Sequence, residues 1–165
     1  ATAAASSSQN QSKYEANVAS VAGKMDNRVI AAYQQLGFKL VVDPSVNYSG
    51  YFDARSRSIT MKQIDDSVYH ELGHFLAFIA GNVDKTASFQ SIFAAEKANV
   101  TAFNKAYVTQ NASEYFAESV KDYILNNASL KSTRPQTYAA VQNALNQITD
   151  AQIAKIQKIY GAFWN

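Results

Sequence analysis

Residues 65–81 read DDSVYHELGHFLAFIAG and contain both histidines of the 165-residue chain, His70 and His74. The stretch begins with an aspartate that can cap a helix and closes with a glycine that can end one, so it predicts a helix. Apolar residues surround the histidines, which indicates that this helix is partly buried. Histidines four residues apart lie on one face of a helix, and both imidazoles can therefore reach one metal ion.

The central residues of this stretch, HELGH (70–74), match the H-E-x-x-H pattern. Glu71 is rotated by about 100° from His70 around the helix and can lie beside the open position of a metal ion. There it would act as a general base that takes a proton from a water molecule at the metal. A catalytic zinc site usually has three protein ligands, and the chain has no cysteine and no third histidine. The remaining ligand is therefore expected to be a carboxylate.

Several downstream carboxylates could complete the site, and the residues alone leave the choice open. Positions 77 and 80 are both alanine, so the metzincin continuation with its third histidine is absent. Glu114 and Glu118 lie one turn apart on a second expected helix, and Asn111-x-x-Glu114 is also a capping box, which gives Glu114 a purely structural alternative. The candidates are Asp84, Glu96, Glu114, Glu118 and Asp122.

The rest of the chain predicts an α+β fold with a small sheet in the N-terminal half and helices after it. Expected helices cover 13–36, 65–80, 87–98, 112–126, 135–147 and 150–160, and expected strands cover 38–42, 51–52 and 57–62. The polar, low-complexity residues 1–12 predict a disordered lead-in, and 13–165 predict a single domain. The alternating strand RSITMK (57–62) suits either a sheet edge that pairs with an extended peptide or a protected edge without a partner.

Composition excludes several classes of protein. The absence of cysteine excludes disulfide scaffolds, cysteine zinc fingers and cysteine nucleophiles. A net charge of +2 is too weak for an electrostatic nucleic-acid binder. No apolar run approaches the roughly 18 residues of a membrane span. We expect a monomer that binds no nucleic acid and has no membrane span.

Three features together resemble the anthrax lethal factor-like metallopeptidases: HELGH (70–74), Tyr107, and EYFAE (114–118) seven residues after that tyrosine. Within this group the chain is most similar to the secreted bacterial Pro-Pro endopeptidases. The segments that carry this similarity are FQSIFAAEKA (89–98), EYFAESVKDYILN (114–126) and RPQTY (134–138). The resemblance covers roughly residues 58–145.

The resemblance implies a zincin-like helical bundle with an H-E-x-x-H helix and a second ligand helix. It implies that His70, His74 and Glu114 bind Zn²⁺ in a gluzincin-type set, while Glu71 is the general base. It implies that Tyr107 donates a hydrogen bond to the oxyanion and that Glu118 holds a ligand histidine from behind. The expected activity is zinc-dependent endopeptidase cleavage of an extended peptide or protein, including at Pro-Pro sites. The expected location is outside a bacterial cell, after removal of a signal peptide.

Two departures concern specificity rather than chemistry. The segment 43–65 is short and lacks the tryptophan-containing loop of the Pro-Pro endopeptidases, and Ser113 stands where that group has an acidic residue. The resemblance therefore implies zinc chemistry more strongly than Pro-Pro specificity. The alternative function is a non-catalytic zinc-containing module that binds protein, such as an inactive toxin-like domain. Intact Glu71 and Tyr107 favour the enzyme.

Overall fold

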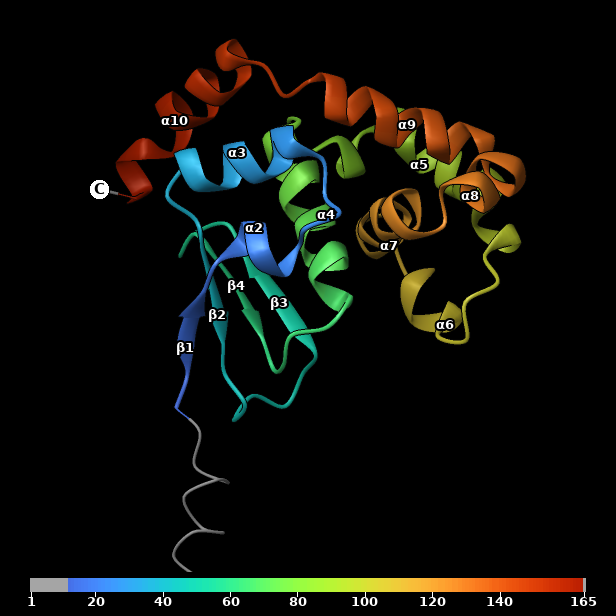
Figure 1. The fold of residues 1–165 in the computed structure, drawn as a ribbon. Helices are drawn as coiled ribbons and strands as arrows, with labels where there is room; N and C mark the ends of the chain where they lie inside the picture. Colours follow the sequence, from blue (N-terminus) through green and yellow to red (C-terminus); the bar gives the residue numbers. More distant parts are fainter. Residues whose placement is uncertain (1–11, 165) are drawn as a thin grey trace, which may run out of the picture.

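A four-stranded sheet and a set of helices make up the part of the chain that the computed structural model describes, residues 12–164 (Figure 1). The sheet order is β1-β2-β4-β3. The pair β2–β4 is parallel, whereas β1–β2 and β3–β4 are antiparallel. The strands are β1 (Tyr14–Ala16), β2 (Lys39–Val42), β3 (Gly50–Asp53) and β4 (Ser58–Met61). The prediction of a mixed α+β fold with a small sheet in the N-terminal half is confirmed.

The strand expected at the sheet edge is not at the edge. β4 pairs with β2 on one side and with β3 on the other, so its main chain is used within the sheet. Ile59 and Met61 are fully buried, because they face the core between two neighbouring strands. The edge next to the helices is β3 instead. Both edge interpretations of 57–62 were wrong, because alternation marks a two-faced strand but not its place in the sheet.

The single helix expected over 13–36 was also wrong. Its first residues form β1, and two helices follow, α2 (Val18–Val21) and α3 (Asn27–Gln35). The Asn17 side chain accepts hydrogen bonds from the backbone at the start of α2, and Asp26 accepts one from Arg28 N at the start of α3. Each side chain therefore starts a separate helix, which the apolar periodicity alone did not reveal.

The later helices follow the predicted order. The HELGH segment lies in α4 (Ser67–Ile79), and α7 (Ala112–Leu125) and α9 (Pro135–Asn146) begin where the caps and the proline indicated. The short helices α6 (Lys105–Val108) and α8 (Asn127–Thr133) were not predicted, because they span too few residues for a periodic pattern. The remaining elements are the turns η1 (Val83–Lys85) and η2 (Lys97–Asn99) and the helices α5 (Ala87–Glu96) and α10 (Asp150–Trp164).

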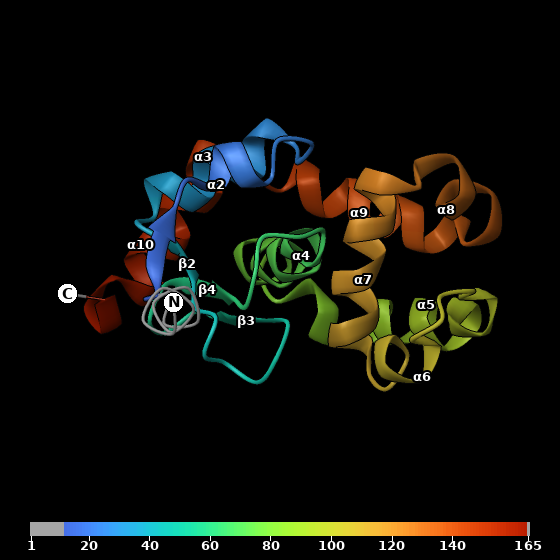
Figure 2. The same ribbon diagram turned by 60° about the horizontal axis from the view of Figure 1, so that its bottom comes forward.

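Helix α4 is the centre of the fold. It lies between the sheet and α7, as the end-on view shows (Figure 2), so its residues are buried almost all round. On the sheet side, Phe75 packs against Tyr33 and Phe38 with ring centroids 4.9 Å apart in each pair. On the other side, a Cβ on Gly73 would lie only 2.6 Å from the Ala117 carbonyl oxygen. This close crossing fixes α4 against α7.

The lead-in expected over 1–12 lies almost wholly outside the described residues, and the single domain over 13–165 stays a prediction. Within residues 12–164, no helix combines the length and the apolar character that crossing a membrane requires.

Candidate active site

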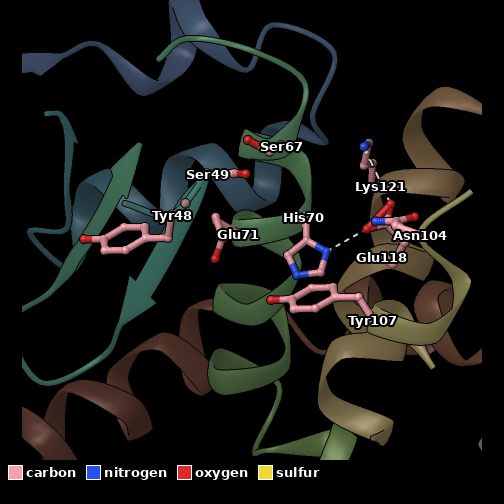
Figure 3. Close-up of a pocket in the computed structure, with 10 residues that line it drawn as sticks. Tyr48, Ser49, Ser67, His70, Glu71, Asn104, Tyr107, Glu118 and Lys121 are labelled. Atoms are coloured by element: carbon pink, nitrogen blue, oxygen red, sulfur yellow. Dashed lines mark hydrogen bonds and ion pairs between the residues drawn. The ribbon is translucent and has the colours of Figure 1, made fainter. Parts of the chain in front are cut away.

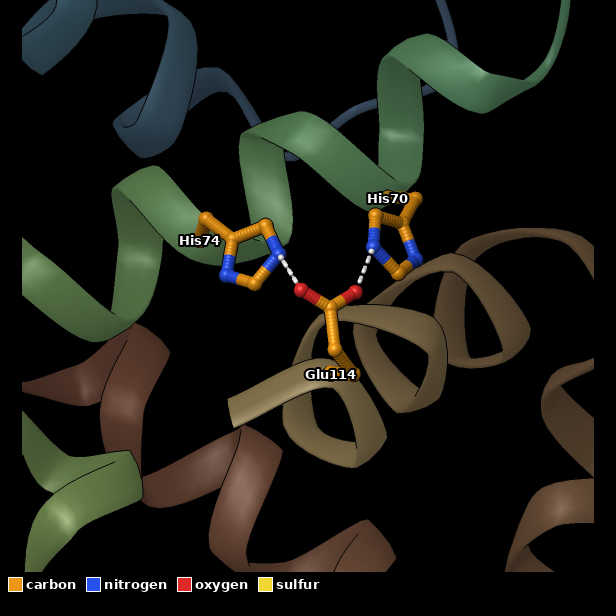
Figure 4. Close-up of side chains that lie close together, drawn as sticks. All are labelled: His70, His74 and Glu114. Atoms are coloured by element: carbon orange, nitrogen blue, oxygen red, sulfur yellow. Dashed lines mark hydrogen bonds and ion pairs between the residues drawn. The ribbon is translucent and has the colours of Figure 1, made fainter. Parts of the chain in front are cut away.

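Two histidines of α4 and one carboxylate of α7 converge at the crossing of these helices. Glu114 lies between the imidazoles, with Oε2 2.9 Å from His70 Nε2 and Oε1 3.2 Å from His74 Nε2 (Figure 4). One potential ligand atom from each residue lies within 4.8 Å of the others. Two imidazoles and a carboxylate are the nitrogen and oxygen donors that zinc binds in catalytic sites. The residue types and their convergence therefore fit a zinc ion.

Glu114 reaches this position because its backbone and its side chain have different partners. Its backbone N–H donates to the Asn111 side chain at 2.8 Å, as expected of a helix cap. Its carboxylate does not return to the cap and turns toward the histidines instead. One residue earlier, the Ser113 hydroxyl donates to the buried Asp84 at 2.5 Å. The first turn of α7 is thus held on both sides of Glu114.

The other candidate ligands have different partners. Asp84 accepts from Ser113, and Asp122 forms an ion pair with Arg134 at 2.5 Å. Glu96 is buried and accepts from the backbone of Gln136 and Thr137 at the start of α9. None of these three carboxylates lies among the side chains that converge on the histidines.

Glu118 contacts the ring nitrogen of His70 that Glu114 does not contact. Its Oε2 is 2.8 Å from His70 Nδ1, and because an ionised carboxylate only accepts, the nitrogen donates. Burial disfavours the charged form of His70, but the hydrogen bonds to Glu114 and Glu118 outweigh it and raise the pKa of His70 to about 9. A bound cation would replace the proton on Nε2 and leave Nδ1–H on Glu118, the usual arrangement of a metal-bound histidine.

The three carboxylates of the site differ in their acidity. Burial raises the pKa of Glu71, and the nearby histidines only partly oppose this effect. Burial also acts on Glu114 and Glu118, but their contacts with the histidines are stronger and hold both pKa values below the usual range. Glu114 and Glu118 are therefore suited to remain ionised, whereas Glu71 is the carboxyl most ready to accept and hold a proton.

A pocket of about 370 Å³ opens in front of His70 and Glu71 (Figure 3). Tyr107, from the short helix α6, lines its wall, and the centroid of its ring lies 6.4 Å from that of His70. The phenol is half exposed, and burial together with the nearby Glu114 raises its pKa, so it stays protonated and able to donate. Of the residues expected from the sequence, His70, Glu71, Tyr107 and Glu118 line this pocket, while His74 and Glu114 contact each other beside it.

The edge strand β3 forms the wall opposite α7. A Cβ on Gly50 would lie 2.9 Å from Glu71 Cγ, and the Phe52 ring stacks on that of His74 with centroids 6.5 Å apart. Sequence reasoning missed Gly50, Gly73 and Lys121, which also lines the pocket. The glycine within HELGH was a signal for a close helix crossing, but nothing in the sequence named the partner helix.

Comparison with known proteins agrees with this geometry. Residues 54–144, more than half of the chain, match the family described as anthrax toxin lethal factor, N- and C-terminal domain. The chain belongs to the anthrax toxin lethal factor family. The matched residues include α4 and α7 and therefore His70, His74 and Glu114.

One curated relative shows a more specific similarity within this family. The chain is 41% identical over 78 residues to the Pro-Pro endopeptidase of Clostridioides difficile (strain 630). This match covers 45% of the chain and 34% of the relative, so the chain spans only about a third of that protein. The resemblance to Pro-Pro endopeptidases within the lethal factor family is thereby confirmed.

Proposed function

We propose that this chain is a zinc-dependent endopeptidase with a zincin-like active site. The observation that carries the proposal is the convergence of His70, His74 and Glu114. The pocket beside this cluster is lined by His70, Glu71 and Tyr107. Membership of the lethal factor family and the similarity to a protein named Pro-Pro endopeptidase support it. The proposed unit is one peptidase domain over 13–165 that acts as a monomer outside a bacterial cell.

In this proposal His70, His74 and Glu114 hold the zinc ion. When bound, zinc would supply a Lewis acid that polarises the scissile carbonyl and makes water more acidic. Glu118 keeps the His70 ring in the orientation that directs Nε2 into the site, because it accepts from Nδ1–H on the opposite side of the ring.

The proton and the oxyanion are handled by Glu71 and Tyr107. Glu71 takes a proton from the attacking water and passes it to the leaving amine, a role that suits its raised pKa. The Tyr107 hydroxyl donates to the oxygen that gains negative charge in the transition state. An extended peptide can pair with the main chain of β3, which forms one wall of the site.

The test replaces Glu71 by glutamine, which keeps size and hydrogen bonding but removes the base. We expect zinc to stay bound at one ion per chain, while kcat on a cleavable peptide falls by about 10²–10⁴-fold. Glu15→Gln is the matched control, because Glu15 lies on β1 and, among residues 12–164, forms its ion pair with the exposed Lys39. The control should keep the wild-type kcat. Full activity of Glu71→Gln would refute the proposed role.

Cleavage at proline is the first specificity to test, because the relative is named for it. A peptide library with proline varied around the scissile bond, treated with the zinc-loaded protein, measures both activity and specificity. Turnover at Pro-Pro bonds would support the finer proposal, and turnover elsewhere would limit it to peptidase activity. Stoichiometric zinc without cleavage of any peptide would favour the non-catalytic binding module.

A further inference from the structure

A second hollow of about 560 Å³ continues from the candidate active site. Its lining shares Ser49, Ser67, Asn104, Glu118 and Lys121 with the pocket in front of the histidines, so the two form one groove. We call the second part the distal groove. It runs between the loop 99–104 and the α7–α8 corner, and half of its side chains are amides and hydroxyls.

The direction of a bound peptide follows from β3, if the chain is the peptidase proposed above. Gly50 lies beside Glu71 and Phe52 beside His74, so β3 and α4 run the same way. Antiparallel pairing is the more stable mode of strand addition. A peptide paired in this way runs from the Phe52 end to the Gly50 end and then past Ser49. Residues on the C-terminal side of the cleaved bond therefore lead into the distal groove.

Lys121 is placed to select what enters this groove. Its Nζ is 3.6 Å from Glu118 Oε1, beyond hydrogen-bond distance, and its side chain is 29% exposed. The lining also contains Asp122 and Arg134, whose charged groups form an ion pair with each other at 2.5 Å. Within the described lining, the Lys121 ammonium is thus the cation whose donors remain available to a ligand. Figure 3 shows it beside Glu118, across the pocket from Tyr48.

We propose that Lys121 and the distal groove form a subsite for a carboxylate on the C-terminal side of the cleaved bond. The carboxylate is either an aspartate or glutamate side chain or the C-terminus of the peptide. Three ammonium donors in a partly buried groove give a charge-assisted hydrogen bond that an amide cannot match. Lys121 is then a residue that determines specificity and takes no part in the chemical step.

The test compares peptides that share one cleavable core and carry Glu or Gln at each of the second to fifth positions after the bond. Each peptide is made with a free and with an amidated C-terminus, which separates the two sources of the carboxylate. We expect the wild-type protein to cleave one Glu peptide, or one free-acid peptide, with a kcat/KM about fivefold or more above its neutral partner. In Lys121→Gln this ratio should fall to about one, and in Lys121→Glu it should fall below one, because two carboxylates repel each other.

Lys131→Gln is the matched control, because Lys131 lies over the Tyr138 ring and outside the lining of the groove. It should keep the wild-type ratio. Equal cleavage of acidic and neutral peptides, a preference only before the bond, or a ratio that Lys121→Gln leaves unchanged would each overturn the inference.

Calorimetry measures how tightly the zinc-loaded protein binds the acidic and the neutral peptides. It therefore tests the carboxylate subsite separately from peptide cleavage. If no peptide is cleaved, the peptidase proposal fails. Tighter binding of the acidic peptide to wild type than to Lys121→Gln would still support the carboxylate subsite. Equal affinities would overturn it.

Discussion

Glu114 shows how a single position can satisfy a structural and a chemical demand together. Its N–H is used by the cap residue Asn111, while its carboxylate reaches both histidines. The hydrogen bond from Ser113 to Asp84 holds the same turn from the other side. The Asn111 half of the capping box is therefore formed, but the Glu114 carboxylate contacts the histidines and does not return to the Asn111 backbone.

Gly50 limits the space around the proposed base. A Cβ there would meet Glu71 Cγ at 2.9 Å, Glu71 Oε2 at 3.0 Å and Met61 Sδ at 3.1 Å. We expect Gly50→Ala to displace the Glu71 carboxylate and lower kcat by about tenfold or more, since displacements near 1 Å can cost about 100-fold. Zinc content should not change, because the ligands lie on α4 and α7. Steady-state kinetics with metal analysis checks this, and an unchanged kcat would contradict it.

The sequence identified the α4 side of the site but not its full surroundings. HELGH defined His70, Glu71 and His74 because helical spacing alone places them. Spacing left Glu114 open against Asp84 and other carboxylates, and only the family resemblance favoured it. Its meeting with the histidines depends on the packing of α7 against α4, which no local pattern encodes. Lys121 was missed for the same reason.

The crossing of α4 and α7 belongs to the scale of elements. A Cβ on Gly73 would meet backbone atoms of Ala117 at 2.6–3.1 Å, and backbone cannot move aside as a flexible side chain can. We expect Gly73→Ala to push the helices apart, to destabilise the fold by about 1–3 kcal/mol and to weaken zinc binding. Chemical denaturation and competition with a chromophoric chelator measure the two effects.

Gly23→Ala is the control for this prediction. A Cβ at Gly23 would meet only backbone oxygens 3.9 Å away, which is ordinary contact. This variant should keep the wild-type stability within about 1 kcal/mol and the wild-type zinc affinity. If Gly73→Ala and Gly23→Ala had the same stability and the same zinc affinity, the α4–α7 crossing would not need a glycine and the prediction would be wrong.

The elements themselves were predicted unevenly. The long helices α4, α7 and α9 were found because caps, apolar periodicity and Pro135 agreed over many residues. The segment 13–36 was predicted as one helix from its apolar repeat. The two caps Asn17 and Asp26 instead start two separate helices within it. The edge position of β3 could not be foreseen, since the order of strands depends on contacts distant in sequence.

At the scale of the whole molecule, zinc should contribute to stability. Binding to the folded state alone adds about 2.7 kcal/mol at a free zinc concentration of 100 times Kd. For a chain of this size we expect chelation to lower Tm by about 5–10 °C. Thermal unfolding with and without a chelator tests this. In His74→Ala the chelator should have little effect, and an identical wild-type Tm in both conditions would contradict a zinc site.

The last helix reaches back to the strand that lines the site. Trp164 in α10 donates its indole N–H to the Ala54 carbonyl at 3.0 Å, and the Arg57 guanidinium lies over its ring, 5.2 Å from the centroid. Both partners belong to the turn between β3 and β4. A change at Trp164 can therefore reach β3 through this turn, although the three proposed ligands lie on α4 and α7, far from α10 in sequence.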